Sequence, residues 1–208
     1  MSECAIFFAA GLMERVWHEI EHLCEAAWDG LERSGLGLSY ADHLERSPSG
    51  FSATYGYTYK VTGAFRGQKK PAHLMLAFDL CRPGPPTDWP PGSAALLLVG
   101  YGPSADDPWD LDMLAFGTDG LLKDPDVRAD LIPTPGTDGR LLSYPDGEGD
   151  KVWSRRSWLF AVPFSALSGP AEVDQNVVRP VASLMAREKP SVAPLLASGA
   201  IQWPTPQP

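Results

Sequence analysis

Residues 51–62 read FSATYGYTYKVT, and this stretch decides the fold class. Apolar and aromatic side chains occupy every second position: Phe51, Ala53, Tyr55, Tyr57, Tyr59 and Val61. Small or polar side chains lie between them. Because successive side chains of a strand point to opposite faces, the pattern predicts a β-strand with one buried face. After a polar stretch, residues 73–80 are predicted to return as its antiparallel neighbour.

Further segments extend the predicted sheet. Residues 94–99 (AALLLV) are apolar at every position, which predicts a central strand or one covered on both faces. Residues 141–144 and 152–163 flank a hexapeptide rich in Pro, Gly and Asp and therefore predict a hairpin. Two GTDG tetrapeptides, at 117–120 and 136–139, predict turns with glycine at positive φ.

The clearest helical pattern covers residues 12–34. Six apolar residues recur there at intervals of three or four: Leu12, Val16, Ile20, Leu23, Ala27 and Leu31. Gly35 and Gly37 follow at the place where a helix C-terminus is expected.

Two shorter helices are also predicted. The first begins at Ser39, has Asp42 as a capping-box partner three residues on, and ends before Pro48. The second begins at Pro180, a favourable first-turn residue, and its apolar stripe starts at Val181.

The sequence therefore predicts a single α+β domain over residues 1–189. Its sheet is mainly antiparallel, the N-terminal and C-terminal helices pack on it, and long loops rich in proline and glycine connect the elements. The 20 glycines and 21 prolines among 208 residues account for the loops. Residues 190–208 hold five prolines and are predicted to form a Pro-rich C-terminal tail, either docked or loose.

Charge excludes two classes of partner. The chain has 17 Lys and Arg against 26 Asp and Glu, a formal net charge of -9. Binding to nucleic acid or to an anionic membrane surface relies on Lys and Arg, so neither is expected. Three widely spaced cysteines predict no disulfide framework and a reducing compartment. Without a basic start or an apolar run of about 18 residues, a cytoplasmic protein is expected.

One short motif carries catalytic residue types. His18-Glu19-Ile20-Glu21-His22 matches H-E-x-x-H, and these five residues resemble the signature of zinc metallopeptidases. On a helix, two histidines four residues apart can share a zinc ion while the glutamate acts as general base. His43 or Glu45 would supply a third ligand. The resemblance implies a zinc-dependent hydrolase, with zinc bound by His18 and His22.

Other features of the same helix favour a solvated face. At about 100° per residue, His18 and His22 point away from the apolar stripe that contains Ile20 and Leu23. Glu21 places a charge where the signature normally has an uncharged residue, and only 17 residues precede the motif. The hydrolase therefore remains the alternative interpretation, and no catalytic residue and no cofactor are assigned in the preferred one.

Aromatic residues provide the candidate binding site. Trp89 and Trp109 fall in loops among Pro, Gly and Asp, where they either form a recognition surface or cap the ends of the sheet. Tyr55, Tyr57 and Tyr59 either form a stacking platform or face the core with their hydroxyls at a rim.

These observations favour a non-enzymatic binding protein that engages a protein partner. An acidic surface speeds encounter with a basic partner by electrostatic steering, so a basic protein is the expected one. A small-molecule pocket between the tyrosine row and the helices is a third interpretation.

Overall fold

A computed structural model describes residues 3–46, 54–62, 71–79, 95–102, 132–143 and 155–203. Within these ranges, the side chains of residues 3–10, 42–46, 54–55, 79 and 132 lie outside the described part. The turn predicted at residues 117–120 also lies outside the described residues.

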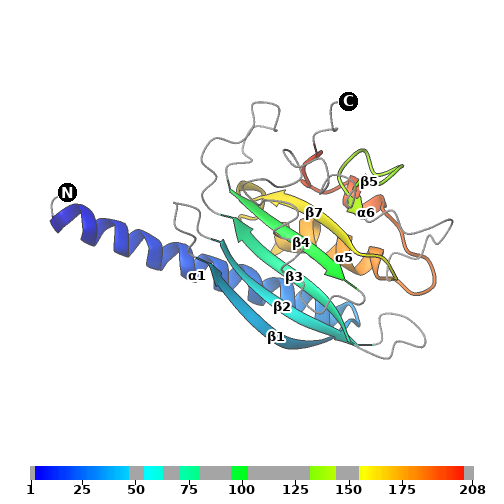
Figure 1. The fold of residues 1–208 in the computed structure, drawn as a ribbon, viewed down its shortest axis with the longest axis horizontal. Helices are drawn as coiled ribbons and strands as arrows, with labels where there is room; N and C mark the ends of the chain where they lie inside the picture. The colour runs from blue at the N-terminus through cyan, green and yellow to red at the C-terminus, as the bar shows by residue number, and fades with distance from the viewer. Residues whose placement is uncertain are drawn as a thin grey trace.

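Figure 1 shows one sheet with helices on one of its faces. The strands are β1 (Gly37–Arg46), β2 (Thr54–Thr62), β3 (Ala72–Asp79), β4 (Leu96–Gly102), β5 (Ile132–Pro133), β6 (Leu142–Ser143) and β7 (Trp158–Pro163). The helical elements are α1 (Glu3–Arg33), η2 (Phe164–Ala166), α4 (Pro170–Val173), η3 (Asp174–Val178), α5 (Arg179–Leu184) and α6 (Ala193–Leu196). The predicted α+β class is confirmed.

Among the described residues, the strands follow the order β1-β2-β3-β4-β7-β6-β5, and every neighbouring pair is antiparallel. The first four strands are consecutive in the chain. The predicted strand at 51–62 is β2, and its predicted return is β3, with Tyr57 opposite Leu76. The apolar segment near 94–99 is β4, which lies between β3 and β7 with every residue buried. The predicted hairpin brings β6 beside β7.

The core lies between the sheet and the helices. Alternate residues of the central strands face it, among them Tyr59, Leu76, Val99 and Phe160. Tyr101, Trp158 and Phe160 stack along this face, with ring centroids 5.3 and 6.0 Å apart in succession. This apolar contact with the helices is what the alternation in β2 predicts.

The opposite face of the central strands is also apolar and buried. Met75, Leu98 and Leu159 alternate with the core-facing residues, and each is fully buried. Both faces of the central strands are therefore excluded from water, as the unbroken apolar run of β4 predicts.

The long helix α1 contains the predicted segment 12–34 and starts earlier, at Glu3. The helix ends at Arg33, just before Gly35 and Gly37, as predicted. Gly35 adopts φ 85°, and its N–H donates to the carbonyl oxygen of Glu32 at 2.9 Å. The Ser34 hydroxyl donates to the carbonyl oxygen of Leu31 at 2.6 Å. These bonds satisfy carbonyl groups that the last turn of a helix leaves free.

The helix predicted from Ser39 is wrong, because residues 37–46 form the edge strand β1. Tyr40 lies opposite Tyr59, whereas after a bulge Asp42 lies opposite Thr58. The bulge interrupts the alternation of side chains and so hides the strand signal in the sequence. Pairing with β2 then outweighs the local capping pattern.

The C-terminal helix begins ten residues before the predicted Pro180. Helical backbone runs from Pro170 through α4, η3 and α5 to Leu184. Pro180 has no N–H to donate, and its ring crowds the carbonyl four residues earlier. A π-helical turn precedes it, in which the Arg179 N–H donates to the Asp174 carbonyl oxygen. This wider turn accommodates the proline inside the helical segment.

The C-terminal residues up to Trp203 dock on the body. Trp203 donates its backbone N–H to the Gly139 carbonyl oxygen at 2.8 Å and its indole N–H to the Arg140 carbonyl oxygen at 3.1 Å. The Ile201 N–H donates to the Ala161 carbonyl oxygen of β7 at 2.9 Å. The turn at 136–139 that receives Trp203 has Gly136 and Gly139 at positive φ, as predicted.

A buried asparagine connects this segment to the helices. The Asn176 amide donates to the Ala166 carbonyl oxygen at 2.8 Å and accepts the Gly199 N–H at 2.8 Å. Both partners would lose their hydrogen bonds if the side chain were removed.

In the part of the chain that the structure describes, no helix has both the length and the apolar character that crossing a membrane requires.

Close packing of α1 on η3 predicts that alanine substitutions at two glycines of α1 change stability in opposite directions. A Cβ at Gly30 would lie 2.6 Å from Cγ2 of Val178, whereas a Cβ at Gly11 would meet nothing within 4 Å. We expect Gly30→Ala to lower the free energy of unfolding by about 1–2 kcal/mol, because the β-branched Val178 has little rotamer freedom in a helix. Gly11→Ala should raise it by about 0.5–1 kcal/mol through helix propensity. Urea denaturation of both variants measures this, and equal effects would contradict it.

The Asn176 bridge gives a second expectation. Asn176→Ala should lower the free energy of unfolding by about 2–4 kcal/mol, since it leaves the Ala166 carbonyl and the Gly199 N–H without their partner. The matched control is Gln175→Ala at the exposed neighbouring position, which should stay within about 0.5 kcal/mol. Thermal denaturation compares the two variants. A stability loss in Asn176→Ala no larger than that in Gln175→Ala would contradict the role given to the Asn176 hydrogen bonds.

Candidate protein-binding surface

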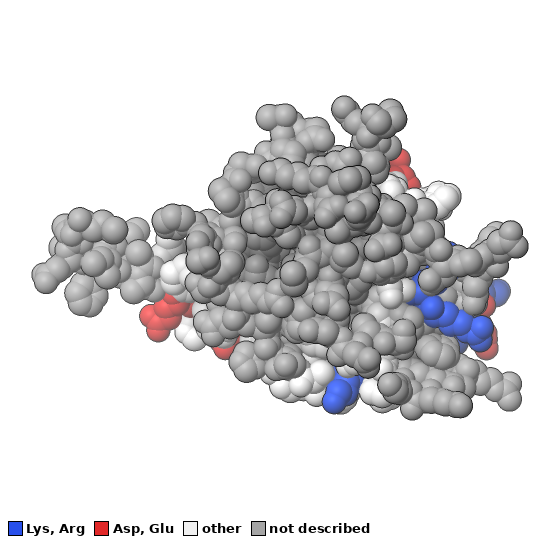
Figure 2. All heavy atoms as spheres, viewed as in Figure 1, with Lys and Arg blue, Asp and Glu red and all other residues white. Residues whose placement is uncertain are grey.

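The solvent side of α1 forms a continuous acidic stripe. Residues recurring at three- and four-residue spacing line it, and we call them the acidic ridge: Glu14, His18, Glu21, His22, Glu25, Asp29 and Glu32. All are exposed except Glu21, which is half-buried. The whole of α1 carries seven carboxylates against two arginines, so it accounts for most of the net charge of -9. In Figure 2, acidic side chains are visible in red beneath the projecting helix.

Glu21 occupies the centre of the acidic ridge and is held on both sides. The Trp17 indole N–H donates to its Oε1 at 2.9 Å, and His18 Nδ1 lies 3.3 Å from its Oε2. The carboxylate therefore has a defined orientation at the surface. A fixed acceptor gains more from an incoming cation than a freely rotating one, because less rotamer entropy is lost on binding.

The acidic ridge also repels itself. Glu21, Glu25 and Asp29 follow one another at intervals of four residues. Like charges at this spacing destabilise a helix by about 0.2–0.5 kcal/mol per pair. A cationic group placed along the ridge would relieve that repulsion.

An aromatic cluster lies where α1 crosses β2. The rings of Trp28 and Tyr59 have centroids 5.0 Å apart and planes tilted by 54°. Cys24 is a buried free thiol beside them. Burial raises the pKa of the Cys24 thiol above 9.0, with the nearby Glu21 carboxylate adding to the shift. The cluster anchors the ridge to the sheet.

The tyrosines of β2 differ in exposure. Burial raises the pKa of Tyr59 above 10.0, and the ring is only 4% exposed, so it belongs to the core. Tyr57 is half-buried; its pKa is also raised, first by burial and then by the neighbouring Cys24 and Glu21. The side chain of Tyr55 lies outside the described residues, as do Trp89 and Trp109.

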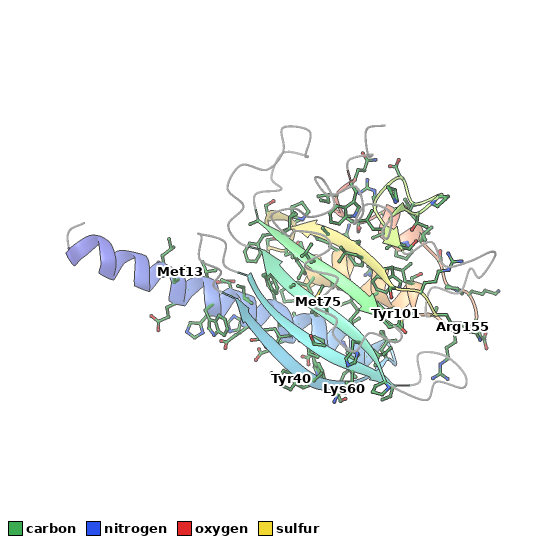
Figure 3. The ribbon with its side chains drawn as sticks, in the orientation of Figure 1. Met13, Tyr40, Lys60, Met75, Tyr101 and Arg155 are labelled. Atoms are coloured by element: carbon green, nitrogen blue, oxygen red, sulfur yellow. The ribbon has the colours of Figure 1, made fainter. Side chains whose placement is uncertain are left out.

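One exposed aromatic residue was not expected from the sequence. Tyr40 on β1 lies opposite Tyr59, and 53% of it is exposed (Figure 3). Its position follows from β1 being a strand, whereas the sequence predicted a helix there. Only the pairing of residues 38–40 with β2 could have revealed it.

The two histidines of the H-E-x-x-H stretch lie on the acidic ridge, away from the sheet. Both are exposed, and His18 contacts Glu21. Groups of three or more metal-ligating side chains do not occur among the described residues. The proposed third ligands His43 and Glu45 lie on β1, and their side chains are outside the described part.

A scan of protein-family models and searches of curated proteins and of solved structures give no match to this chain.

Burial of titratable groups predicts an alkaline loss of stability. The folded-state pKa values of Cys24 and Tyr59 lie above their ordinary values of 9.0 and 10.0. Their contribution to the free energy of unfolding is therefore fully present below about pH 9. It is lost as the pH rises further, because the unfolded chain releases these protons at lower pH than the folded chain does. Between its unfolded-state and folded-state pKa, each group lowers the free energy of unfolding by about 1.4 kcal/mol per pH unit.

Urea denaturation between about pH 8 and pH 11 measures this slope. Tyr59→Phe should give a shallower decline than the unaltered protein. Phe78→Leu weakens the same core without removing a titrating group, so it should lower stability equally at every pH. An unchanged slope in Tyr59→Phe would contradict the assignment.

Proposed function

We propose that this chain is a non-enzymatic binding protein that engages a basic protein partner through the acidic ridge of α1. The observation that carries the proposal is the ridge itself: five carboxylates repeat along one face of a rigid helix, where Arg15 and Arg33 are the only cations among the described side chains of α1. A net negative field along such a face speeds encounter with an oppositely charged protein.

The scaffold supports this use of the helix. The opposite side of α1 is buried against the sheet and η3, with Ile20 and Leu31 fully buried. Rigid elements position binding groups more accurately than loops do, since fewer side chains must be ordered on binding. The ridge side chains other than Glu21 are exposed, and Figure 1 shows that the N-terminal end of the same helix extends past the sheet.

The proposal predicts a salt-dependent capture that specific carboxylates control. The immobilised protein is incubated with cell extract, and retained proteins are identified by mass spectrometry. The triple variant Glu14→Gln, Glu25→Gln, Asp29→Asn should retain the basic partner about tenfold less than the unaltered protein. Raising the salt to about 0.5 M should have a similar effect, because the Debye length then falls below the distance between exposed charges.

A control variant with the same change in net charge separates the ridge from a general charge effect. Asp138→Asn, Glu172→Gln and Glu188→Gln remove three carboxylates elsewhere in the described structure. This control should retain the partner as the unaltered protein does. Equal loss in both triple variants, or no protein held above background, would refute the proposal.

A further inference from the structure

Two tyrosines lie near the β1 edge of the sheet, on the face that α1 covers. Tyr40 of β1 lies opposite Tyr59 of β2, and directly opposed residues of antiparallel strands point to the same face. Tyr57 lies two positions before Tyr59 on β2 and therefore points to this face as well. Tyr59 is buried against Trp28 of α1, whereas Tyr40 is 53% exposed (Figure 3) and Tyr57 is half-buried. Tyr40 and Tyr57 therefore keep ring surface within reach of a ligand.

Acidic groups of α1 lie beside these tyrosines. Burial is the first cause that raises the pKa of Tyr57, and the further causes are its electrostatic neighbours Cys24, Glu21, Tyr40 and Glu25. Groups shift one another's pKa in this way only at short range, so α1, β1 and β2 bring them together. Each of these neighbours is neutral or negative. The field at this point therefore favours a cation.

The cations of the same elements lie elsewhere. Among the described side chains of α1, β1 and β2, the lysines and arginines are Arg15, Arg33 and Lys60. At about 100° per residue, Arg15 and Arg33 each lie about 120° round the helix from Glu21, on the side away from Trp28. Lys60 alternates with Tyr59 on β2 and so points to the opposite face of the sheet. None of the three side chains faces the two exposed tyrosines.

We infer that Tyr40, Tyr57 and Glu21 form a site for the guanidinium group of an arginine on the partner. We call these three residues the guanidinium site. The inference rests on the proposed function and names the side chain that the partner contributes. A guanidinium group is planar and less strongly hydrated than an ammonium group, so it stacks on aromatic rings more readily than lysine does. Its paired N–H donors also match the two oxygens of a carboxylate.

Glu21 is suited to receive those donors. Trp17 and His18 hold its two oxygens, at 2.9 and 3.3 Å, and each oxygen has a second lone pair for a further hydrogen bond. The side chain is 40% exposed, so a cation can reach it from water. Because the carboxylate is already oriented, an incoming guanidinium group loses little rotamer entropy on its behalf.

Two peptides of equal charge test the inference. Fluorescent hexa-arginine and hexa-lysine gain similar long-range attraction from the acidic ridge, so the ratio of their dissociation constants reports what arginine gains by contact. Fluorescence anisotropy at about 50 mM salt should show hexa-arginine binding about fivefold more tightly to the unaltered protein.

Variants of the full chain locate that preference. Tyr40→Leu should reduce the ratio to about twofold or less, whereas Tyr40→Phe keeps the ring and should keep the ratio. The thermal midpoints of both should stay close to that of the unaltered protein, because Tyr40 is exposed. Glu21→Gln keeps an acceptor for the Trp17 indole but removes the charge, and should also reduce the ratio. The control Leu196→Ala alters an exposed leucine on α6 and should leave the ratio unchanged.

The same measurements separate this inference from the proposed function. Glu14→Gln with Asp29→Asn removes ridge charges outside the guanidinium site, so it should weaken both peptides and leave their ratio unchanged. A ratio that both Tyr40→Leu and Glu21→Gln leave unchanged would overturn the inference. If the triple ridge variant still loses its captured protein, the proposed function stands and only the guanidinium site fails. A ratio that depends on Tyr40, together with capture that survives the triple ridge variant, would instead refute the proposed function and support the site.

Discussion

The packing of α1 across the sheet and against η3 is the contact on which the rest of the molecule depends. It buries Ile20 and Leu31 on one side and brings Gly30 within reach of Val178 on the other. At this point the glycine has no side chain, and the helix therefore approaches η3 more closely than any other residue would allow. The N-terminal helix, the sheet and the C-terminal helices consequently share one core.

Because of this contact, α1 has a packed side and a solvent-exposed side, and it has a packed C-terminal part and an N-terminal part that extends past the sheet. The side of α1 that faces away from the sheet is charged. Its carboxylates remain in water, because burying them would cost far more free energy than their mutual repulsion does. Further toward the N-terminus, the apolar side chains of Leu12 and Met13 are exposed. A single helix thus carries structural, electrostatic and apolar surfaces whose relative positions are fixed by one packed segment. The core of the domain therefore also sets the geometry of the candidate interface.

The parts predicted correctly from sequence are those whose signal is periodic and local. The alternation of β2, the apolar run of β4 and the spacing from Val16 to Leu31 each reflect a face buried along the whole element. The edge strand β1 escaped prediction because a bulge near Ala41 shifts its alternation, and because its stability comes from β2 rather than from its own residues. Pro180 was mistaken for a helix start, since the π-helical turn that accommodates it has no sequence signature.

The candidate site was predictable only in part. The acidic, solvated side of α1 follows from the helical positions of His18 and His22. Burial of Tyr59 by Trp28 does not follow from sequence, because it depends on which helix crosses which strand. The exposure of Leu12 and Met13 does not follow either, since an apolar residue at helical spacing is normally buried. It requires knowing where the sheet ends.

The hydrogen bond from Ile201 to Ala161 has a consequence for synthesis of the chain. One edge of β7 pairs with β4. On the other edge, the short strand β6 pairs only with the start of β7, and Ala161 is instead hydrogen-bonded by Ile201, about forty positions later in the chain. A chain emerging from the ribosome therefore exposes an unpaired, strongly apolar strand edge until residue 203 has left the exit tunnel. Unpaired edges of this kind recruit other strands. Between synthesis of β7 and arrival of Trp203, nascent copies are therefore open to aggregation through this edge.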